Sequence, residues 1–76
     1  MNDILVQTIA RALPCDAKKL TFDSGFSRTR NWDSLGHVRV MSAIEQEFGL
    51  ELTPQTIEAL LTIKDIEAFV FGSKEH

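Results

Sequence analysis

The apolar residues between positions 34 and 48 recur with the spacing of one helix face, and this pattern constrains the fold more than any other part of the chain. Four of them stand at i, i+1, i+4 and i+8, namely Val40, Met41, Ile44 and Phe48. One side of an amphipathic helix buries such a stripe against a core. Gly49 follows directly, and glycine readily takes the left-handed conformation in which helices end. The sequence therefore predicts a helix over 34–48, with His37 at the edge of its apolar stripe.

The residues before Pro14 predict a first helix. Asn2 and Asp3 are favoured N-cap residues, and they precede a run of apolar residues at helical spacing. The members of that run are Leu5, Ile9, Ala12 and Leu13. Proline disfavours the helical conformation of the residue before it, so this helix of about ten residues ends near position 13.

Two further helices are predicted after Gly49. Thr53-Pro54 is typical of an N-cap followed by proline at the first helical position. It opens a short third helix whose apolar residues are Ile57, Leu60 and Leu61. Thr62 and Asp65 have capping-box spacing and open a fourth helix, which ends at Gly72. We expect its inward face to carry Ile63, Ile66, Phe69 and Val70. Residues 73–76 are expected to form a frayed tail.

The segment from Cys15 to Asp33 shows no sustained period, and Leu20, Phe22 and Phe26 are isolated apolar residues within it. A connection this long in so small a chain is usually functional or contains a short turn of helix. No segment alternates with period two for long enough to predict a strand. The expected fold is all-α: a small antiparallel four-helix bundle in one domain over 1–76, with a short third helix and a long loop between the first two.

Composition and charge exclude several classes of protein. A hydrophobic content of 43% is normal for a globular chain. No apolar run approaches the ~20 residues that span a bilayer, and no signal-peptide pattern is present, so we expect a cytoplasmic protein. The formal charge of −3 argues against a nucleic-acid partner. The charge is uneven: residues 1–33 hold five Lys/Arg and four Asp/Glu, whereas residues 34–76 hold three and seven.

Catalytic and metal chemistry find little support in the sequence. The single cysteine, Cys15, cannot form an internal disulfide and is interpreted as a small apolar residue. Two histidines, His37 and His76, are too few and too far apart for a metal site. Ser34 and His37 lie one turn apart, but no orienting third group beyond Asp33 and no evident substrate cavity accompany them. We therefore expect a protein that is not an enzyme and has no catalytic residue.

Ser34 stands where the long loop meets the helix over 34–48. The simplest interpretation is that Asp33 or Ser34 only caps this helix. Two features favour a further role. Leu35 and Val38 lie off the buried stripe, on the face that Ser34 shares, and a monomer gains nothing from exposed apolar residues unless a partner covers them. A phosphodiester on Ser34 would also lie at the positive end of the helix dipole, which favours an anion by about 0.3–1 kcal/mol.

Three segments of the chain form a recognisable pattern: Asp33-Ser34-Leu35, Ile44-Glu45-Gln46-Glu47-Phe48-Gly49 and Leu52-Thr53-Pro54. With this pattern the chain resembles the acyl carrier protein family over nearly its whole length. It extends to Leu20, to Phe26 eight residues before the serine, and to Thr62-Ile63-Lys64-Asp65-Ile66. The tripeptide alone would recur by chance, but the tripeptide followed at fixed spacing by Glu-x-Glu-Phe-Gly is specific.

The resemblance implies that Ser34 carries 4′-phosphopantetheine. A phosphopantetheinyl transferase, using its own bound Mg²⁺, would move the group from coenzyme A to the serine hydroxyl, and Asp33 would help that enzyme engage the site. The terminal thiol would hold an acyl or aminoacyl cargo as a thioester, received from a loading ligase and passed to a downstream transferase or synthase. The carrier is expected to be a monomer. Its expected partner-binding residues are Leu35, Val38, Arg39, Ser42, Ile57 and Trp32.

The chain departs from the family pattern around this serine. Fatty-acid carriers commonly have acidic residues before and after the Asp-Ser-Leu, whereas this chain has Arg28 and Arg30 before it and Gly36, His37 and Arg39 after it. Partners that grip an acidic rim through basic patches would meet like charge here. We therefore predict a carrier of a specialised pathway, of polyketide, non-ribosomal peptide, aminoacyl or glycan-modifying type.

Two alternatives stay open from the sequence. The chain could be a housekeeping carrier of fatty-acid synthesis, or an unmodified helical adaptor that binds its partner through Leu35, Val38 and Trp32. Trp32 itself has two interpretations: an anchor that holds the loop over the bundle, or an exposed landing point for a partner, as aromatic residues at interfaces often are.

Overall fold

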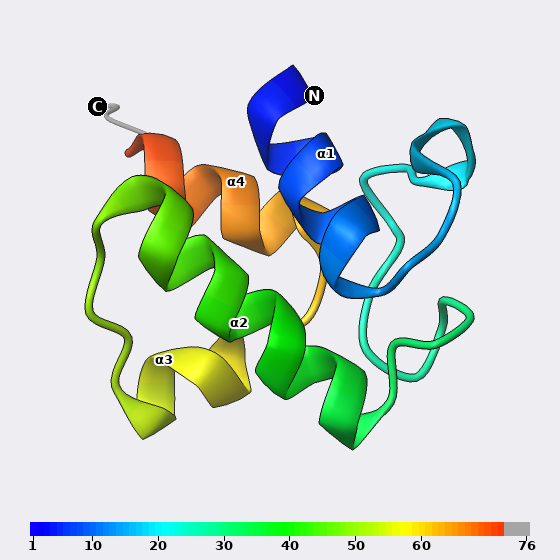
Figure 1. Ribbon diagram of the computed structural model, residues 1–76. Helices are drawn as coiled ribbons and strands as arrows, with labels where there is room; N and C mark the ends of the chain where they lie inside the picture. Colours follow the sequence, from blue (N-terminus) through cyan, green and yellow to red (C-terminus); the bar gives the residue numbers. More distant parts are fainter. Residues whose placement is uncertain (73–76) are drawn as a thin grey trace.

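The chain folds into four α-helices joined by one long connection and two short ones (Figure 1). The computed structural model describes residues 1–72. Its helices are α1 (Asp3–Ala12), α2 (Ser34–Phe48), α3 (Pro54–Ala59) and α4 (Ile63–Phe71), with a short 3₁₀ turn, η1 (Ala17–Lys19), in the long connection. Within the described range there is no β-strand, only an isolated bridge between Gly25 and Thr62. The predicted all-α bundle with a short third helix is confirmed; the predicted tail at 73–76 lies outside the described residues.

Local capping groups set the helix boundaries. The side chain of Asn2 accepts a hydrogen bond from the Leu5 N–H at the start of α1, and Thr53 and Thr62 cap α3 and α4 in the same way. Gly49 ends α2 with a φ of 64°, the left-handed conformation that favours glycine. The predicted starts of all four helices are confirmed. The third helix is shorter than predicted, because Leu60 leaves helical geometry and Leu61 lies beyond it.

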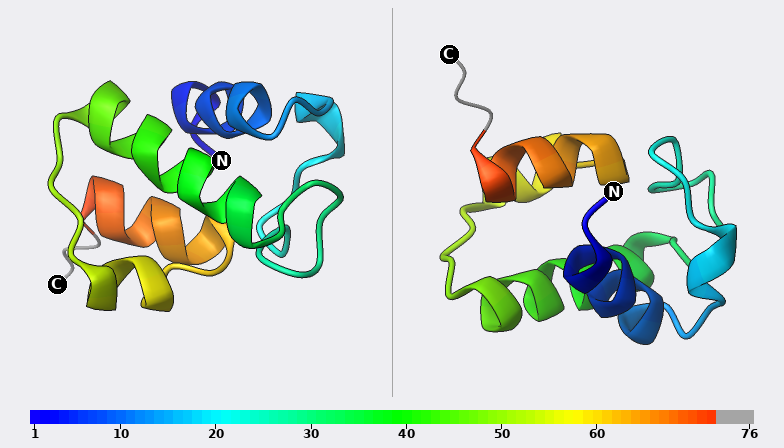
Figure 2. Two further views of the ribbon diagram at one scale, coloured as in Figure 1. Left: turned by 60° about the horizontal axis from the view of Figure 1, so that its bottom comes forward. Right: turned by 90° about the horizontal axis from the view of Figure 1, so that it is seen from above.

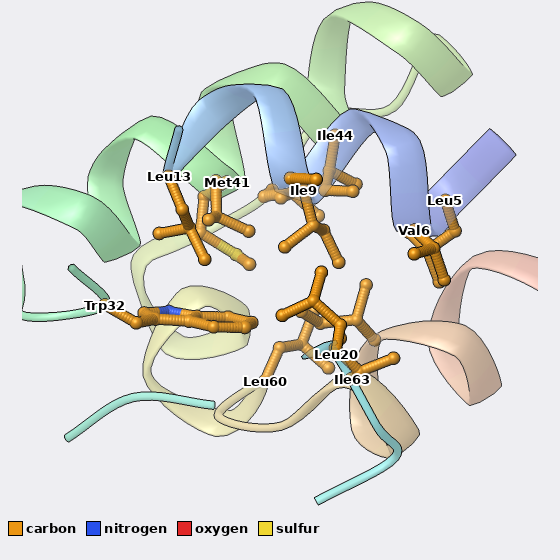
Figure 3. Packing of buried hydrophobic residues seen from close by; sticks show 14 residues of the cluster. Leu5, Val6, Ile9, Leu13, Leu20, Trp32, Met41, Ile44, Leu60 and Ile63 are labelled. Carbon is orange, nitrogen blue, oxygen red and sulfur yellow. The ribbon is translucent and has the colours of Figure 1, made fainter. Parts of the chain in front are cut away.

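One hydrophobic core lies among the four helices and the long loop; Figure 2 shows how these segments are arranged, and Figure 3 shows the buried side chains. The most deeply buried side chains come from α1, α2, α4 and the loop: Leu5, Ile9, Leu13, Trp32, Val40, Met41, Ile44, Ile63 and Ile66. The prediction for Phe69 is wrong, since this side chain is 45% exposed. Two successive i+3 steps from Ile63 turn a residue about 120° around the helix, which carries Phe69 off the face that Ile63 and Ile66 bury.

The long loop is fixed to the C-terminal half of the chain by backbone hydrogen bonds. Phe26 N–H donates to the Leu61 carbonyl over 2.8 Å, and Ile63 N–H donates to the Ser24 carbonyl over 2.9 Å. Gly25 lies so close to Leu61 that a Cβ at position 25 would overlap the Leu61 carbonyl oxygen. The loop therefore crosses the bundle as an ordered layer, and it presents its last residues to the start of α2. None of the helices within residues 1–72 has the length and apolar character needed to cross a bilayer.

Candidate functional site

The start of α2 leaves the Ser34 hydroxyl exposed and free. Asp33 is the N-cap, and its carboxylate accepts a hydrogen bond from the Gly36 N–H over 2.9 Å. Ser34 is therefore the first helical residue and not the cap. Its side chain is exposed, and among residues 1–72 its hydroxyl has no hydrogen-bond partner. Asp33 therefore caps the helix, and Ser34 is not needed as the cap.

The turn before Ser34 packs closely against α2. Asn31 has a φ of 70°, a left-handed conformation that asparagine tolerates better than most residues, and its amide Nδ2 donates to the Leu13 carbonyl over 3.1 Å. The Asn31 carbonyl lies directly over Gly36, where any Cβ would overlap it. Glycine at position 36 therefore permits the close approach that places Ser34 at the rim of the bundle.

Trp32 lies in the core and is not part of a docking surface. Its side chain is 1% exposed, and its indole ring lies beside Leu13 and Met41 at one end of the core (Figure 3). The expected role of Trp32 as a partner-binding residue is wrong, since no partner reaches a side chain this deeply buried. The other interpretation, an anchor that holds the loop over the bundle, agrees with this burial in the core cluster, and the Trp32 backbone also bonds within the loop, to the Thr29 carbonyl and the Ser27 N–H.

His37 is also buried, at 7% exposure, and lies on the buried face of α2 together with Val40, Met41 and Ile44, where the sequence predicted only the edge of the apolar stripe. Trp32 Nε1 donates to His37 Nδ1 over 2.9 Å, and His37 Nε2 lies 2.9 Å from the Ile57 carbonyl oxygen in α3. The ring of Phe26 packs edge-on against the imidazole, with centroids 5.5 Å apart. With these polar and aromatic contacts, the His37 imidazole takes a position on the inner face of α2 where the other buried side chains are apolar.

The outward face of α2 carries the two apolar residues that lie off the buried stripe. Leu35 is 60% exposed and Val38 is 61% exposed. Val38, Arg39 and Ser42 together line a shallow groove of about 410 Å³ that reaches the end of α1 at Ala12. The structure thus brings three predicted partner-binding residues into one groove, with Leu35 exposed in the first turn of the same helix.

Ile57, the remaining predicted partner-binding residue, belongs to a different helix. It lies in α3, which meets α2 where His37 Nε2 lies 2.9 Å from the Ile57 carbonyl oxygen. Its side chain is half-buried and packs against the core. Ile57 therefore presents only part of its side chain to a partner.

Basic side chains gather along the long loop that leads to Ser34. Lys19, Arg28 and Arg30 line a hollow of about 660 Å³ that extends to Asn31, three residues before Ser34. Two acidic residues, Asp16 and Asp23, line the same hollow. Among the charged side chains that line this hollow, three are basic and two are acidic.

Glu45 has a structural role that the sequence did not reveal. Its Oε2 accepts a hydrogen bond from the Leu52 N–H over 2.9 Å, and its backbone carbonyl accepts from Leu50 N–H. The first glutamate of the Glu-x-Glu-Phe-Gly segment thus fastens the connection between α2 and α3. Sequence spacing gave no signal for this contact, because its partner lies seven residues away in an irregular segment.

Cys15 and the acidic residues offer no reactive centre. Burial raises the pKa of the Cys15 thiol, and the negative charge of the neighbouring Asp16 raises it further. A thiol with a raised pKa is mostly protonated near neutral pH and is a poor nucleophile. In the part of the chain that the structure describes, no group of three His, Cys, Asp or Glu side chains is arranged to hold a metal ion.

The start of α2 suits a phosphate ester on Ser34. The backbone N–H groups of Ser34 and Leu35 lie in the first turn, where a helix offers them no internal acceptor. No acidic residue lies within the first turn itself, and Asp33 is engaged by Gly36. A 15-residue helix therefore presents free N–H groups and the positive end of its dipole to an anion on this hydroxyl.

Comparisons with known proteins find similarity along most of the chain. A family model described as "Phosphopantetheine attachment site" matches residues 3–70. An acyl carrier protein of Thermosynechococcus vestitus is 34% identical over 62 residues, which cover 82% of this chain and 76% of the relative. An acyl carrier protein of Helicobacter hepaticus is 30% identical over 66 residues, 87% of each chain.

Proposed function

The chain belongs to the acyl carrier protein family, and we propose that Ser34 is the residue to which its 4′-phosphopantetheine is attached. Proteins of this family carry that group covalently and are carriers, not enzymes. The observation that carries the proposal is the exposed Ser34 hydroxyl, left free at the start of α2 because Asp33 caps the helix. The terminal thiol of the attached group supplies the thioester chemistry.

Each neighbour of Ser34 has a defined task in this proposal. Asp33 holds the first turn of α2 in place and presents a carboxylate to a phosphopantetheinyl transferase. Gly36 has no Cβ, so the Asn31 turn packs closely against it and Ser34 lies at the rim of the bundle. Leu35 and Val38 supply exposed apolar area for an enzyme that must contact the serine directly.

The attachment is tested by the intact mass of the protein after incubation with coenzyme A and a promiscuous phosphopantetheinyl transferase. We expect the wild type to gain one phosphopantetheine and Ser34→Ala to gain none. Ser42→Ala is the matched control, because Ser42 is an exposed serine on the same helix. The proposal fails if the wild type gains no mass under conditions that modify an established carrier, or if Ser34→Ala still gains it.

We propose further that this carrier serves a specialised pathway of polyketide, non-ribosomal peptide, aminoacyl or glycan-modifying type. Arg28 and Arg30 lie along the loop beside the Ser34 end of α2, and Arg39 lines the groove on its outward face. A partner with a basic docking patch would meet these cations, whereas one with acidic or apolar residues would be favoured. The cargo would come from a loading ligase and pass to a transferase or synthase.

Charge reversal tests the pathway proposal. The double variant Arg28→Glu, Arg39→Glu should be accepted more readily than the wild type by fatty-acid synthase enzymes, measured as kcat/KM with the modified carrier as substrate. An unchanged kcat/KM would remove the electrostatic reason for a specialised pathway and would favour the housekeeping carrier. The unmodified adaptor is weakened by the burial of Trp32, one of its three proposed contacts.

A further inference from the structure

His37, in α2, joins the long loop to α3 through its two ring nitrogens. Trp32 Nε1 donates to His37 Nδ1 over 2.9 Å, and His37 Nε2 lies 2.9 Å from the Ile57 carbonyl oxygen. An indole N–H only donates, so Nδ1 is the acceptor and carries no proton. A carbonyl oxygen only accepts, so Nε2 carries the proton and donates to Ile57. The two partners together fix one neutral tautomer of the imidazole.

The carbonyl that His37 binds is one that α3 cannot satisfy internally. Ile57 lies in the last turn of α3, and helix geometry would pair its carbonyl with the Leu61 N–H. Leu61 N–H instead donates to the Ala59 carbonyl over 3.2 Å, because the chain leaves helical geometry at Leu60. The His37 side chain therefore acts as a C-terminal cap for α3, supplied from another helix.

α3 has little core packing of its own: Ile57 packs against the hydrophobic core, and the buried Leu52 and Leu60 flank the helix. It is six residues long and contains no fully buried residue. The side chain of its N-cap, Thr53, is exposed and bonds to Thr56 in the same turn, not to another helix. A helix this short has little stability of its own, so tertiary contacts must hold it. The bond from His37 is one of those contacts and comes from α2, three residues after Ser34.

We propose that His37 is a positioning residue that sets α3 against the Ser34 end of α2 and thereby fixes the surface which partner enzymes contact. Trp32 holds the imidazole in the tautomer that donates, and its own ring is held in the core. The recognition part of this inference rests on the proposed attachment at Ser34; the anchoring of α3 does not.

Two substitutions of His37 should each keep one of its two hydrogen bonds and remove the other. Asn at position 37 places an amide oxygen near the Nδ1 position, where it accepts from Trp32 but cannot reach Ile57. Gln places an amide nitrogen near the Nε2 position, where it donates to Ile57 but leaves Trp32 without an acceptor. The anchoring of α3 should therefore survive in His37→Gln and be lost in His37→Asn, although both variants replace one imidazole by one amide.

Amide hydrogen exchange of the full chain tests the anchoring. We expect the α3 amides to exchange about fivefold faster in His37→Asn than in the wild type, the equilibrium factor for one net hydrogen bond of ~1 kcal/mol. Exchange in α1 should not change, and His37→Gln should match the wild type in α3. Because Trp32 is the only tryptophan, its single indole N–H is resolved in a ¹H–¹⁵N NMR spectrum, and it should exchange with solvent faster in His37→Gln than in His37→Asn, since only asparagine keeps an acceptor for it. Equal exchange of α3 in the wild type and His37→Asn would overturn the anchoring.

Transferase kinetics test the recognition. With a phosphopantetheinyl transferase and coenzyme A, the KM for His37→Asn should rise about fivefold while kcat stays within about twofold, since the serine itself is untouched. The KM for His37→Gln should stay near the wild-type value. Equal KM values for the two variants would overturn the role in recognition. A wild type that gains no phosphopantetheine would refute the proposed function instead, and hydrogen exchange would still decide the anchoring.

Discussion

Gly36→Ala tests the close packing of the Asn31 turn against α2, on which the position of Ser34 depends. In an ordinary helix this change would stabilise the protein by about 1 kcal/mol, because alanine has the higher helix propensity. Here the new Cβ would overlap the Asn31 carbonyl oxygen and lie 3.3 Å from Leu13 Cδ2. A backbone carbonyl cannot turn away as a side chain can, so the Asn31 turn or the first turn of α2 must move.

The magnitude follows from two opposing terms. Overpacking typically costs about 1–3 kcal/mol, and overlap with backbone belongs at or above the upper end. After subtraction of the gain in helix propensity, we expect a net loss of about 2 kcal/mol. For a chain of this size, that loss lowers Tm by roughly 8–16 °C. With a urea m-value of about 1 kcal/mol/M, the midpoint should fall by roughly 2 M.

Urea unfolding followed by circular dichroism and by the fluorescence of Trp32 measures the effect. Ser42→Ala is the control, since it also places alanine on α2 but on the exposed face, and its stability should stay within about 0.5 kcal/mol of wild type. The displaced loop should also slow the modification of Ser34. A Gly36→Ala protein as stable as the wild type would refute the close seating of Asn31 on α2.

Two further predictions concern Cys15 and Glu45. Burial and the charge of Asp16 raise the pKa of the Cys15 thiol, so iodoacetamide should alkylate this thiol more slowly than a free cysteine at pH 8, as alkylation kinetics would show. The stability that the neutral thiol provides should be present below pH 9.0 and be lost as pH rises through the raised pKa, as alkaline unfolding would show. Glu45→Ala should cost about 1 kcal/mol in urea unfolding because the Leu52 N–H loses its acceptor, whereas Glu47→Ala, an exposed site on the same turn, should stay within about 0.5 kcal/mol.

Helix boundaries were predictable from the sequence because their causes are local. Asn2, Thr53 and Thr62 each bond an N–H three residues ahead, and Gly49 takes its left-handed conformation within one residue. Apolar spacing also predicted most of the core. It failed for Phe69, where a series of i+3 steps drifts around the helix and away from the buried face.

The environment of the candidate site was only partly predictable. The exposed Ser34, Leu35 and Val38 follow from their places on one helix. The burial of Trp32 and His37 depends on a side-chain bond across five residues and another across 20. Apolar spacing along a helix carries no signal for such contacts, and an aromatic residue in a polar loop suits a surface as well as a core.

Peptide mapping by tandem mass spectrometry of the protein purified from its native host tests the central claim most directly. We expect the peptide containing Ser34 to carry phosphopantetheine, with any cargo attached to it as a thioester, and we expect fragmentation to place the group on Ser34. A phosphopantetheine found on another residue would contradict the proposed site. A protein that is entirely unmodified at Ser34, isolated beside other carriers that are modified, would contradict the proposed function.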